Sequence, residues 1–191
     1  ESVFVARGMN PPKIGFLYPG QGVQRIGMAM PWVQRYGFVR SSFASADSVA
    51  GDFGGERLSD LIYRNGDRCS PSQLERWNQL LTQTEVSQPA IVAASVAVTN
   101  VLSHFGIVPS LSIGYSLGEW TALWAAGVIS EIDLFRCVAA RGRAMAARGP
   151  ARGGMATVAA SWMQVEQILK QSGGYVTIAG FNSLRQVVIS G

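Results

Sequence analysis

Cysteine, histidine and lysine are all scarce in this sequence of 191 residues. The two cysteines, Cys69 and Cys137, are far apart, and neither belongs to a CxxC pair or to a Cys/His cluster with ligand spacing. This pattern excludes a disulfide-stapled scaffold, argues against a zinc site and is typical of reduced thiols in the cytoplasm. His104 is the only histidine, so chemistry that needs an imidazole has one candidate within the chain.

Long hydrophobic runs are also missing. The longest apolar stretches, at residues 91–94 and 122–129, fall well short of the roughly 18 to 20 residues that a membrane-spanning helix needs. The first residues have neither the pattern of a signal peptide nor an initiating methionine. We therefore expect a cytoplasmic piece of a longer protein, with no membrane segment. The apolar fraction of 48% and the charged fraction of 15% predict a globular chain.

Acidic residues are absent from one arginine-rich stretch. Between Phe135 and Ala160 there is no Asp or Glu, and the arginines there are Arg136, Arg141, Arg143, Arg148 and Arg152. The stretch fits either the solvated face of a helix or an anion site, because the guanidinium fork matches carboxylate and phosphate groups. Nucleic acid is a weaker interpretation, since aromatic residues do not interleave with these charges.

The sequence does contain an alternation of short apolar strands and helices, which predicts an α/β fold. Residues 14–18 are apolar and stop at Pro19 and Gly20, as expected of a buried strand that enters a tight loop. Pro89 suits a first helical turn and Gly106 suits the residue after a helix, so a buried helix is predicted between them. Further elements are predicted as a strand at 111–113 and helices at 120–126 and 132–147.

The pattern changes near Gly153, where we place a domain boundary. Residues 1–12 are interpreted as a tail, 13–152 as a large domain and 153–191 as the start of a smaller one. In the smaller domain we predict a strand at 155–159, a helix at 163–171 and strands at 175–179 and 186–190. Residues 41–81, rich in Ser, Gly, Asp and Arg, predict surface helices and loops without a functional signal.

Residues 114–118 read GYSLG, a GxSxG pattern with an apolar strand before it and a helix of small residues after it. In that context Ser116 is held on a sharp turn at a helix N-terminus, where N–H groups and the helix dipole stabilise negative charge. The two glycines let strand and helix pass closely. The pattern therefore predicts Ser116 as a nucleophile.

A serine that transfers acyl groups needs an oxyanion hole and a general base. The backbone N–H of Leu117, the residue after the serine, is one expected donor. The loop at residues 19–22 leaves its strand at the same carboxyl edge and is a candidate for the second donor, although it also fits a plain Gly/Pro turn. His104 precedes the serine at the end of the buried helix, so a structural role is the better interpretation for it.

Several short motifs, in a fixed order, carry a resemblance to a known family. They are YPGQGVQ at 18–24, QPA at 88–90, GYSLGE at 114–119, RGRAM at 141–145, GM at 154–155, NS at 182–183 and VVISG at 187–191. Together they resemble the malonyl-CoA:acyl-carrier-protein transacylase family, in the form of the acyltransferase domains of polyketide synthases, over residues 13–191. The resemblance implies an α/β-hydrolase-like large subdomain with an inserted ferredoxin-like small subdomain, both incomplete in this chain.

The resemblance also implies an activity. Ser116 would carry the acyl group as an acyl-serine intermediate, with the backbone N–H groups of Gln21 and Leu117 as the oxyanion hole. The enzyme would load a malonyl-type unit from malonyl-CoA onto the phosphopantetheine of an acyl carrier protein. Neighbouring domains of a larger synthase are expected partners, and no cofactor, metal, nucleic acid or membrane is expected.

Four residues are implied to bind the substrate. Gln88 would line the pocket, and Arg141 would clamp the free carboxylate of a malonyl group, with Arg143 as the next candidate. Asn182 corresponds to an asparagine of the small subdomain near the cleft. Tyr115 stands where the family usually has histidine, which puts the acyl selectivity in question more than the activity.

One expected component is missing. The family's catalytic histidine follows the stretch that matches residues 187–191, so the base is expected beyond this chain. Two other functions stay open: a hydrolase of the esterase or thioesterase kind, which needs no carboxylate clamp, and a non-catalytic docking domain of a megasynthase.

Overall fold

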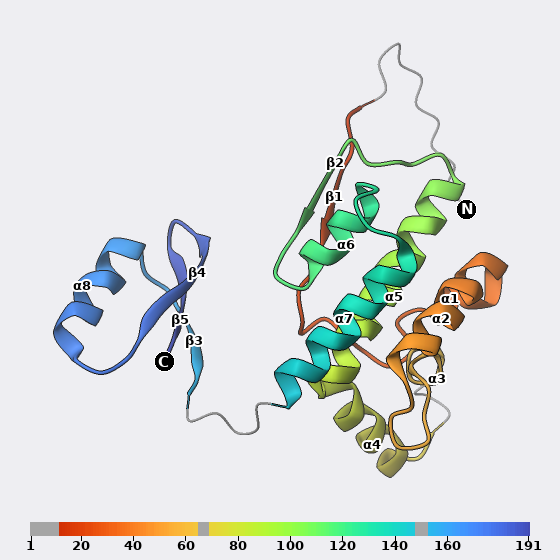
Figure 1. Ribbon diagram of the computed structural model, residues 1–191, viewed down its shortest axis with the longest axis horizontal. Helices are drawn as coiled ribbons and strands as arrows, with labels where there is room; N and C mark the ends of the chain where they lie inside the picture. Colours follow the sequence, from red (N-terminus) through yellow and green to blue (C-terminus); the bar gives the residue numbers. More distant parts are fainter. Residues whose placement is uncertain (1–11, 65–68, 148–152) are drawn as a thin grey trace. The chain divides into compact units, whose positions relative to one another are not determined.

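The chain forms two compact units, Glu1–Ala147 and Arg148–Gly191, in a computed structural model (Figure 1). The structure describes residues 12–64, 69–147 and 153–191. Helices alternate with parallel strands in the first unit and with antiparallel strands in the second. The mixed α/β class predicted from the sequence is therefore confirmed. The predicted boundary between residues 152 and 153 adjoins the stretch 148–152, which lies outside the described residues.

A parallel pair of strands forms the sheet of the first unit. β1 (Gly15–Tyr18) pairs with β2 (Leu111–Gly114), and the register runs from Gly15 opposite Leu111 to Tyr18 opposite Gly114. Parallel neighbours need a crossover connection, and here a long helical segment supplies it. The carboxyl ends of both strands therefore meet at one edge, the edge at which ligand sites form in sheets of this kind.

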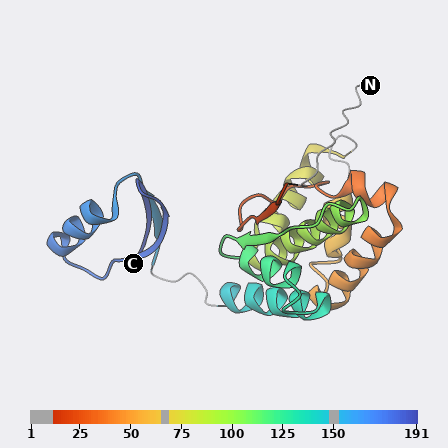
Figure 2. The same cartoon turned by 90° about the horizontal axis from the view of Figure 1, so that it is seen from above.

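The helix α5 (Thr84–His104) is the core of the first unit, surrounded by the other helices as seen in Figure 2. Its buried residues include Val86, Gln88, Ile91, Val92, Val96 and Val101. By length and composition alone α5 is apolar enough to cross a membrane, but 67% of its most apolar window is buried inside the protein. Burial of this extent is typical of the core helix of a globular unit.

Both ends of α5 bear on the sequence predictions. The expected start at Pro89 is wrong, because the helix begins five residues earlier and Pro89 lies inside it. A proline in the second turn removes a single hydrogen bond near the helix start, and burial of the surrounding turns outweighs that loss. The end is as predicted: Gly106 has φ 75°, and the N–H groups of Gly106 and Ile107 donate to Ser103 and Leu102 in a Schellman motif.

The prediction of surface helices and loops for residues 41–81 is wrong in part. α1 (Met30–Arg35) precedes this region, which contains most of α2 (Gly37–Ala50), all of α3 (Leu58–Tyr63) and nearly all of α4 (Pro71–Thr82). Fully buried side chains on these helices are Val39, Phe43, Leu58, Leu61 and Ile62. The apolar residues of these helices recur at helical spacing, so each helix has a core-facing side although the region as a whole is rich in polar residues.

Two more helices complete the first unit. α6 (Gly118–Ala125) follows β2 and contacts both strands, while α7 (Glu131–Ala146) packs along α5. Both confirm the sequence predictions to within two residues. Close packing of α7 on α5 depends on Gly142, since a Cβ there would lie 2.9 Å from the Cα of Glu85.

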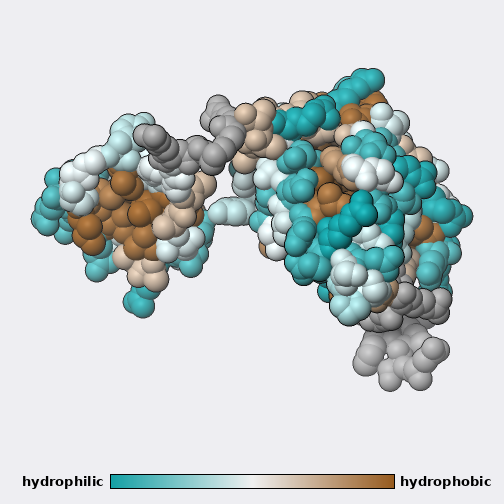
Figure 3. Space-filling model, turned by 90° about the horizontal axis from the view of Figure 1, so that it is seen from below, coloured by the Kyte–Doolittle hydropathy of each residue, from teal (hydrophilic) through white to brown (hydrophobic). Residues whose placement is uncertain are grey.

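The second unit consists of β3 (Met155–Val158), α8 (Trp162–Ser172), β4 (Thr177–Ser183) and β5 (Gln186–Ser190). Its antiparallel sheet has the strand order β3-β5-β4. The strand predicted at 175–179 is displaced, because Tyr175 is 89% exposed and pairing begins only at Thr177. Among the described residues of this unit only Val165 and Val187 are buried, and Figure 3 shows apolar side chains gathered on its surface.

Candidate active site

Ser116 lies on the sharp turn between β2 and α6, as the sequence predicts. Its φ is 53°, and among the described residues it is the only one other than glycine with a positive φ. The turn is fixed by hydrogen bonds from Gly118 N to Tyr115 O at 2.9 Å and from Glu119 N to Ser116 O at 3.2 Å. A left-handed conformation costs an L-residue roughly 1 to 2 kcal/mol. An exposed serine held in this strained conformation is typical of a nucleophile.

The glycines on either side of Ser116 are required by backbone packing. A Cβ on Gly114 would overlap the backbone of Gly118, and a Cβ on Gly118 would overlap the carbonyl of Tyr18. These contacts bring the start of α6 directly against the carboxyl ends of both strands. The turn therefore presents Ser116 at the edge of the sheet, in front of the first N–H groups of α6.

The loop after β1 contacts this turn from the neighbouring strand. Tyr115 N donates to Tyr18 O at 3.0 Å. Gly20 is buried, and a Cβ on it would lie 2.9 Å from the ring of Tyr115. Gln21, the next residue, is exposed. The loop and the turn thus lie side by side, which is the arrangement that the sequence predicted for an oxyanion hole.

Leu117 is 1% exposed and stands at the N-cap of α6. The backbone N–H groups of a first helical turn have no acceptor within the helix. The side chain of Leu117 packs into the core, so its backbone is held firmly directly after the exposed Ser116. These features suit a donor to a developing oxyanion.

A chain of side-chain hydrogen bonds connects the same loop to α5 and α7. Arg141 Nη1 donates to Gln88 Oε1 at 2.7 Å, and Gln88 Nε2 donates to Gln21 Oε1 at 3.4 Å. Gln21 Nε2 donates in turn to Thr84 Oγ1 at 3.4 Å, and Met145 Sδ lies 3.3 Å from Gln88 Nε2. Three residues that the sequence singled out separately, Gln21, Gln88 and Arg141, are therefore brought together.

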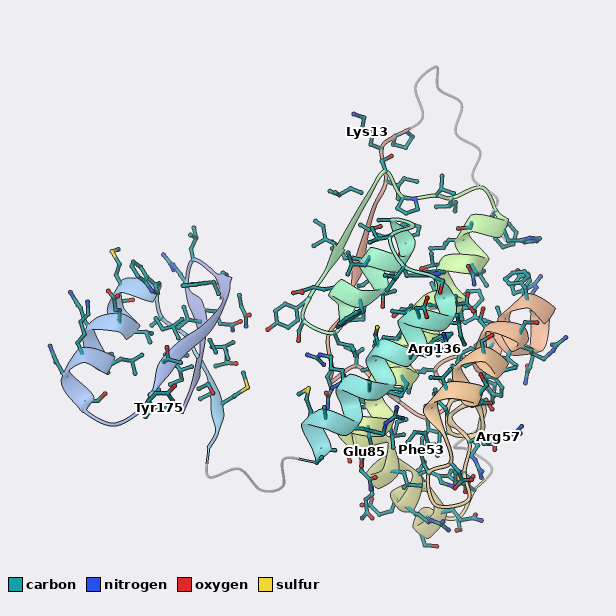
Figure 4. All side chains as sticks on the ribbon, in the orientation of Figure 1. Lys13, Phe53, Arg57, Glu85, Arg136 and Tyr175 are labelled. Carbon is teal, nitrogen blue, oxygen red and sulfur yellow. The ribbon has the colours of Figure 1, made fainter. Side chains whose placement is uncertain are left out.

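Sequence reasoning missed Thr84 and Met145 as members of this chain of hydrogen bonds. Met145 follows Arg141 by four residues and so shares its side of α7, which is a signal that was present in the sequence. Thr84 had none, because the predicted helix started after it. Figure 4 labels Glu85, which lies one turn before Gln88 near the start of α5. This end of α5 lies beside the last turns of α7.

The charge of Arg141 is the main electrostatic feature of this region. Arg141 is half-buried, and in the described parts of the chain none of the ion pairs involves it. Its recorded partner, the amide oxygen of Gln88, is neutral. A half-buried guanidinium paired with a neutral acceptor keeps its full charge for an incoming anion.

Tyr115, Arg143 and Asn182 were also predicted to belong to the site. Tyr115 is 58% exposed beside Ser116, so its phenol ring borders the space in front of the turn. Arg143 is exposed on α7 and is a weaker candidate for the clamp than Arg141. Asn182 belongs to the second unit, where it is exposed and its Nδ2 donates to Gln186 Oε1 at 3.1 Å.

His104 lies at the opposite end of α5 from Gln88. The intervening helix is about 24 Å long at 1.5 Å per residue. His104 is exposed, and its ring centroid lies 5.4 Å from that of Phe38 and 5.3 Å from that of Phe105. It therefore stands at the amino ends of the strands, away from Ser116.

In residues 12–64, 69–147 and 153–191, no group of three or more His, Cys, Asp or Glu side chains is placed to hold a metal ion. Cys69 and Cys137 are half-buried, and neither forms a disulfide bond within these residues. The candidate site contains a strained serine, backbone N–H groups and the half-buried guanidinium of Arg141.

Comparison with known proteins agrees with this geometry. The family model of the acyl transferase domain matches residues 15–191. The malonyl CoA-acyl carrier protein transacylase of Bacillus subtilis (strain 168) is 36% identical over 184 residues, which cover 94% of this chain and 53% of that protein. The PKS-NRPS hybrid synthetase acdB of Aspergillus candidus is 34% identical over 197 residues, which cover 100% of this chain and 7% of the synthetase.

A solved structure gives the same result. A type II PKS acyl-carrier protein in complex with its malonyl-transacylase contains a chain that matches with a TM-score of 0.76 and 32% identity. The match covers 94% of this chain and 55% of the solved chain. This chain thus spans about half the length of the transacylases it matches and a small part of the synthetase.

Proposed function

Because the chain belongs to the acyl transferase domain family, we propose that it loads a malonyl-type group from malonyl-CoA onto an acyl carrier protein. The single observation that carries this proposal is Ser116 in a left-handed conformation at the edge of the sheet, with the Gln21 loop tied to Arg141 through Gln88. The strained turn supplies the nucleophile and the clamp supplies the preference for a carboxylated acyl group.

In the first half of the reaction, Ser116 Oγ attacks the thioester carbonyl of malonyl-CoA. The carbonyl oxygen becomes an oxyanion, which the N–H groups of Gln21 and Leu117 stabilise. Collapse of this intermediate breaks the carbon–sulfur bond and releases the CoA thiol, which leaves the malonyl group as an ester on Ser116. A general base takes the serine proton and returns it to the leaving thiolate.

In the second half, the thiol of the carrier protein's phosphopantetheine attacks the acyl-serine ester. The same oxyanion donors act again, and collapse of the intermediate breaks the ester C–O bond and leaves the malonyl group as a thioester on the carrier. The general base takes the thiol proton and gives it to Ser116 Oγ as the serine leaves. Arg141 holds the malonyl carboxylate through both halves by a charge-assisted bond. We assign the general base to no residue of this chain, since His104 lies at the far end of α5.

We also propose a specific fold for each of the two units. A parallel strand pair with a nucleophile turn and a covering helix is what an α/β-hydrolase-like large subdomain contains. The order β3-β5-β4 with α8 fits the first part of a βαββαβ ferredoxin-like subdomain. Within such an arrangement Asn182 would border the cleft. We further propose a cytoplasmic location, since neither cysteine forms a disulfide bond within the described residues, and no cofactor beyond the substrates.

The proposed partners follow from the relatives. One match is a malonyl-transacylase in complex with an acyl-carrier protein, and another is a multidomain synthetase. We propose that this chain likewise serves an acyl carrier protein and stands beside the other domains of a larger synthase. Two alternatives are a thioesterase-type hydrolase and a non-catalytic docking domain, but neither uses a cationic clamp at Arg141.

Intact-mass measurement separates these functions. The complete protein that contains this chain is exposed briefly to malonyl-CoA, with and without a holo acyl carrier protein. The reaction is quenched in acid, and the intact mass of the protein is measured by mass spectrometry. A transferase gives a stable single malonyl adduct that disappears when the carrier is added. A hydrolase releases free CoA continuously without a carrier, and a docking domain gives neither result; either outcome would overturn the proposal.

A further inference from the structure

Gln88 is the largest fully buried polar side chain among the described residues. It is 0% exposed, and the other buried polar residues among those described are the shorter Ser42, Ser59, Ser87, Thr99 and Thr121. Burying an amide without partners costs roughly 1 to 3 kcal/mol. A large buried amide in a core helix therefore calls for a reason beyond filling space.

The orientation of the Gln88 amide is fixed by the chemistry of its neighbours. A guanidinium has only donors, so the Gln88 atom 2.7 Å from Arg141 Nη1 must be the oxygen. The amide nitrogen then faces Gln21 Oε1 and Met145 Sδ, two acceptors for its two hydrogens. Turning the amide over would place hydrogens against the guanidinium, so Gln88 has one stable orientation.

The orientation of Gln21 follows from that of Gln88. Because Gln88 donates to Gln21 Oε1, the nitrogen of Gln21 faces Thr84, whose hydroxyl oxygen accepts. The four groups thus form one directed chain from Arg141 to Thr84. Gln21 is the residue whose backbone N–H the proposed function places in the oxyanion hole, in a loop where Gly22 has φ 119°.

We propose that Gln88 is a positioning residue that couples the carboxylate clamp to the oxyanion loop. This inference rests on the proposed function and deepens it. Gln88 holds the Arg141 guanidinium in one rotamer and, through the same amide, holds the side chain of Gln21. An acyl group with a carboxylate then meets a clamp that is already oriented, which lowers the entropic cost of binding it.

The two ends of this chain of hydrogen bonds, Arg141 and Thr84, predict different kinetic effects. Loss of the bond to Arg141 removes a charge-assisted hydrogen bond, so malonyl loading should fall roughly tenfold to a hundredfold. Acetyl loading does not use the clamp and should fall much less. Loss of the bond to Thr84 loosens only the oxyanion loop, so both acyl groups should slow together, by roughly threefold to tenfold.

The first experiment uses the near-isosteric Gln88→Glu and the packing-conserving Gln88→Met in the complete protein. Both should lower the malonyl-to-acetyl ratio of kcat/KM at least tenfold. In Gln88→Glu the new carboxylate occupies Arg141 while the side-chain volume is kept, so a merely structural glutamine would leave the ratio unchanged. Gln79→Met, at an exposed glutamine of α4 that bonds Glu75, is the matched control and should leave the ratio unchanged.

The second experiment is a double-mutant cycle. Arg141→Ala and Gln88→Met combined should lower the ratio no further than Arg141→Ala alone, because they remove the same interaction. Thr84→Val should slow both acyl groups without changing the ratio. Independent, additive effects of Gln88→Met and Arg141→Ala on the ratio would overturn the coupling.

The inference and the proposed function fail in distinguishable ways. If the unmodified protein forms no malonyl adduct, the function is wrong, and the positioning role is then read from the reactivity of Arg141 with phenylglyoxal, mapped by peptide mass. Release from Gln88 should raise that reactivity in Gln88→Met but not in Gln79→Met. Equal reactivity of Arg141 in all three proteins would overturn the positioning role.

Discussion

At the scale of single residues, the left-handed conformation of Ser116 suits a nucleophile but lowers the stability of the fold. Its φ of 53° is unfavourable for any residue with a Cβ. We expect Ser116→Gly to raise the free energy of unfolding by about 1 kcal/mol relative to Ser116→Ala, because glycine adopts this conformation without strain. Urea denaturation of both variants measures the difference. Equal stability of the two would mean that the turn is not strained.

A second prediction at this scale concerns Arg141. A charge-assisted pair with a carboxylate is worth about 1.5 to 3 kcal/mol, or roughly tenfold to a hundredfold in kcat/KM. Arg141→Ala should lower the malonyl-to-acetyl ratio by that factor, as measured by loading rates with the two CoA thioesters. A ratio within about twofold of the parent would place the clamp elsewhere, with Arg143 as the next candidate.

The site residues could be predicted from the sequence, but most of their contacts with one another could not. Ser116 was predictable because GxSxG between a strand and a helix has one geometrical meaning. The roles of Gln21, Gln88 and Arg141 came from a family resemblance, while their hydrogen bonds to one another depend on the packing of α5 against α7, which no local pattern encodes. Thr84 was missed for the same reason.

At the scale of elements, the close approach of α6 to the strands depends on Gly118. A Cβ there would overlap the carbonyl of Tyr18, and neither backbone can move freely. We expect Gly118→Ala to destabilise the fold by roughly 2 to 3 kcal/mol in urea titrations. Gly15→Ala is the control in β1, since its Cβ would lie an ordinary 3.9 Å from Leu111 O. A Gly118→Ala variant as stable as Gly15→Ala would contradict the packing.

The start of α3 gives a prediction about pH. The Arg57 side chain donates to both carboxylate oxygens of Asp60 at 3.1 Å, and its hydrogen bonding holds the pKa of Asp60 below the usual range. A lowered folded pKa means stability that is present above about pH 4 and lost as pH falls through the folded pKa. At neutral pH the contribution is less than about 1 kcal/mol, because the pair is largely solvated.

Asp60→Asn should therefore lower the free energy of unfolding at pH 7, and the difference from the parent should shrink as pH falls toward 3. Denaturant titrations at several pH values measure this difference. A difference independent of pH would mean that the pair does not stabilise the helix start.

Elements with strong local signals were predictable. The strands β1 and β2 were marked by apolar runs with glycine and proline at their ends, and the glycines after α5 and α6 have the positive φ that a helix end requires. The start of α5 was not predictable, because proline preference pointed to Pro89 whereas burial of the preceding turn decides. Similarly, the contribution of α2 to α4 to the core emerges only when the helices pack together, because the loops between them are rich in polar residues.

At the scale of the whole molecule, the two units differ in the size of their hydrophobic cores. The first unit has a large cluster of buried side chains around α5, whereas the described part of the second buries only Val165 and Val187. A peptide of residues 153–191 alone is expected to show no cooperative thermal transition, because so small a core cannot offset chain entropy. Residues 1–147 alone should retain one. Circular dichroism on both fragments and on residues 1–191 tests this, and cooperative melting of the small fragment would contradict it.

We propose that Ser116 carries the malonyl group between CoA and a carrier protein. The most direct measurement is tandem mass spectrometry of peptides from the complete protein after a brief pulse of malonyl-CoA, followed by a chase with holo acyl carrier protein. We expect one malonyl ester, on Ser116, which moves to the carrier in the chase. The same ester should form in His104→Ala and should be absent from Ser116→Ala. A malonyl group on another residue, or an adduct of normal yield on Ser116→Ala, would contradict it.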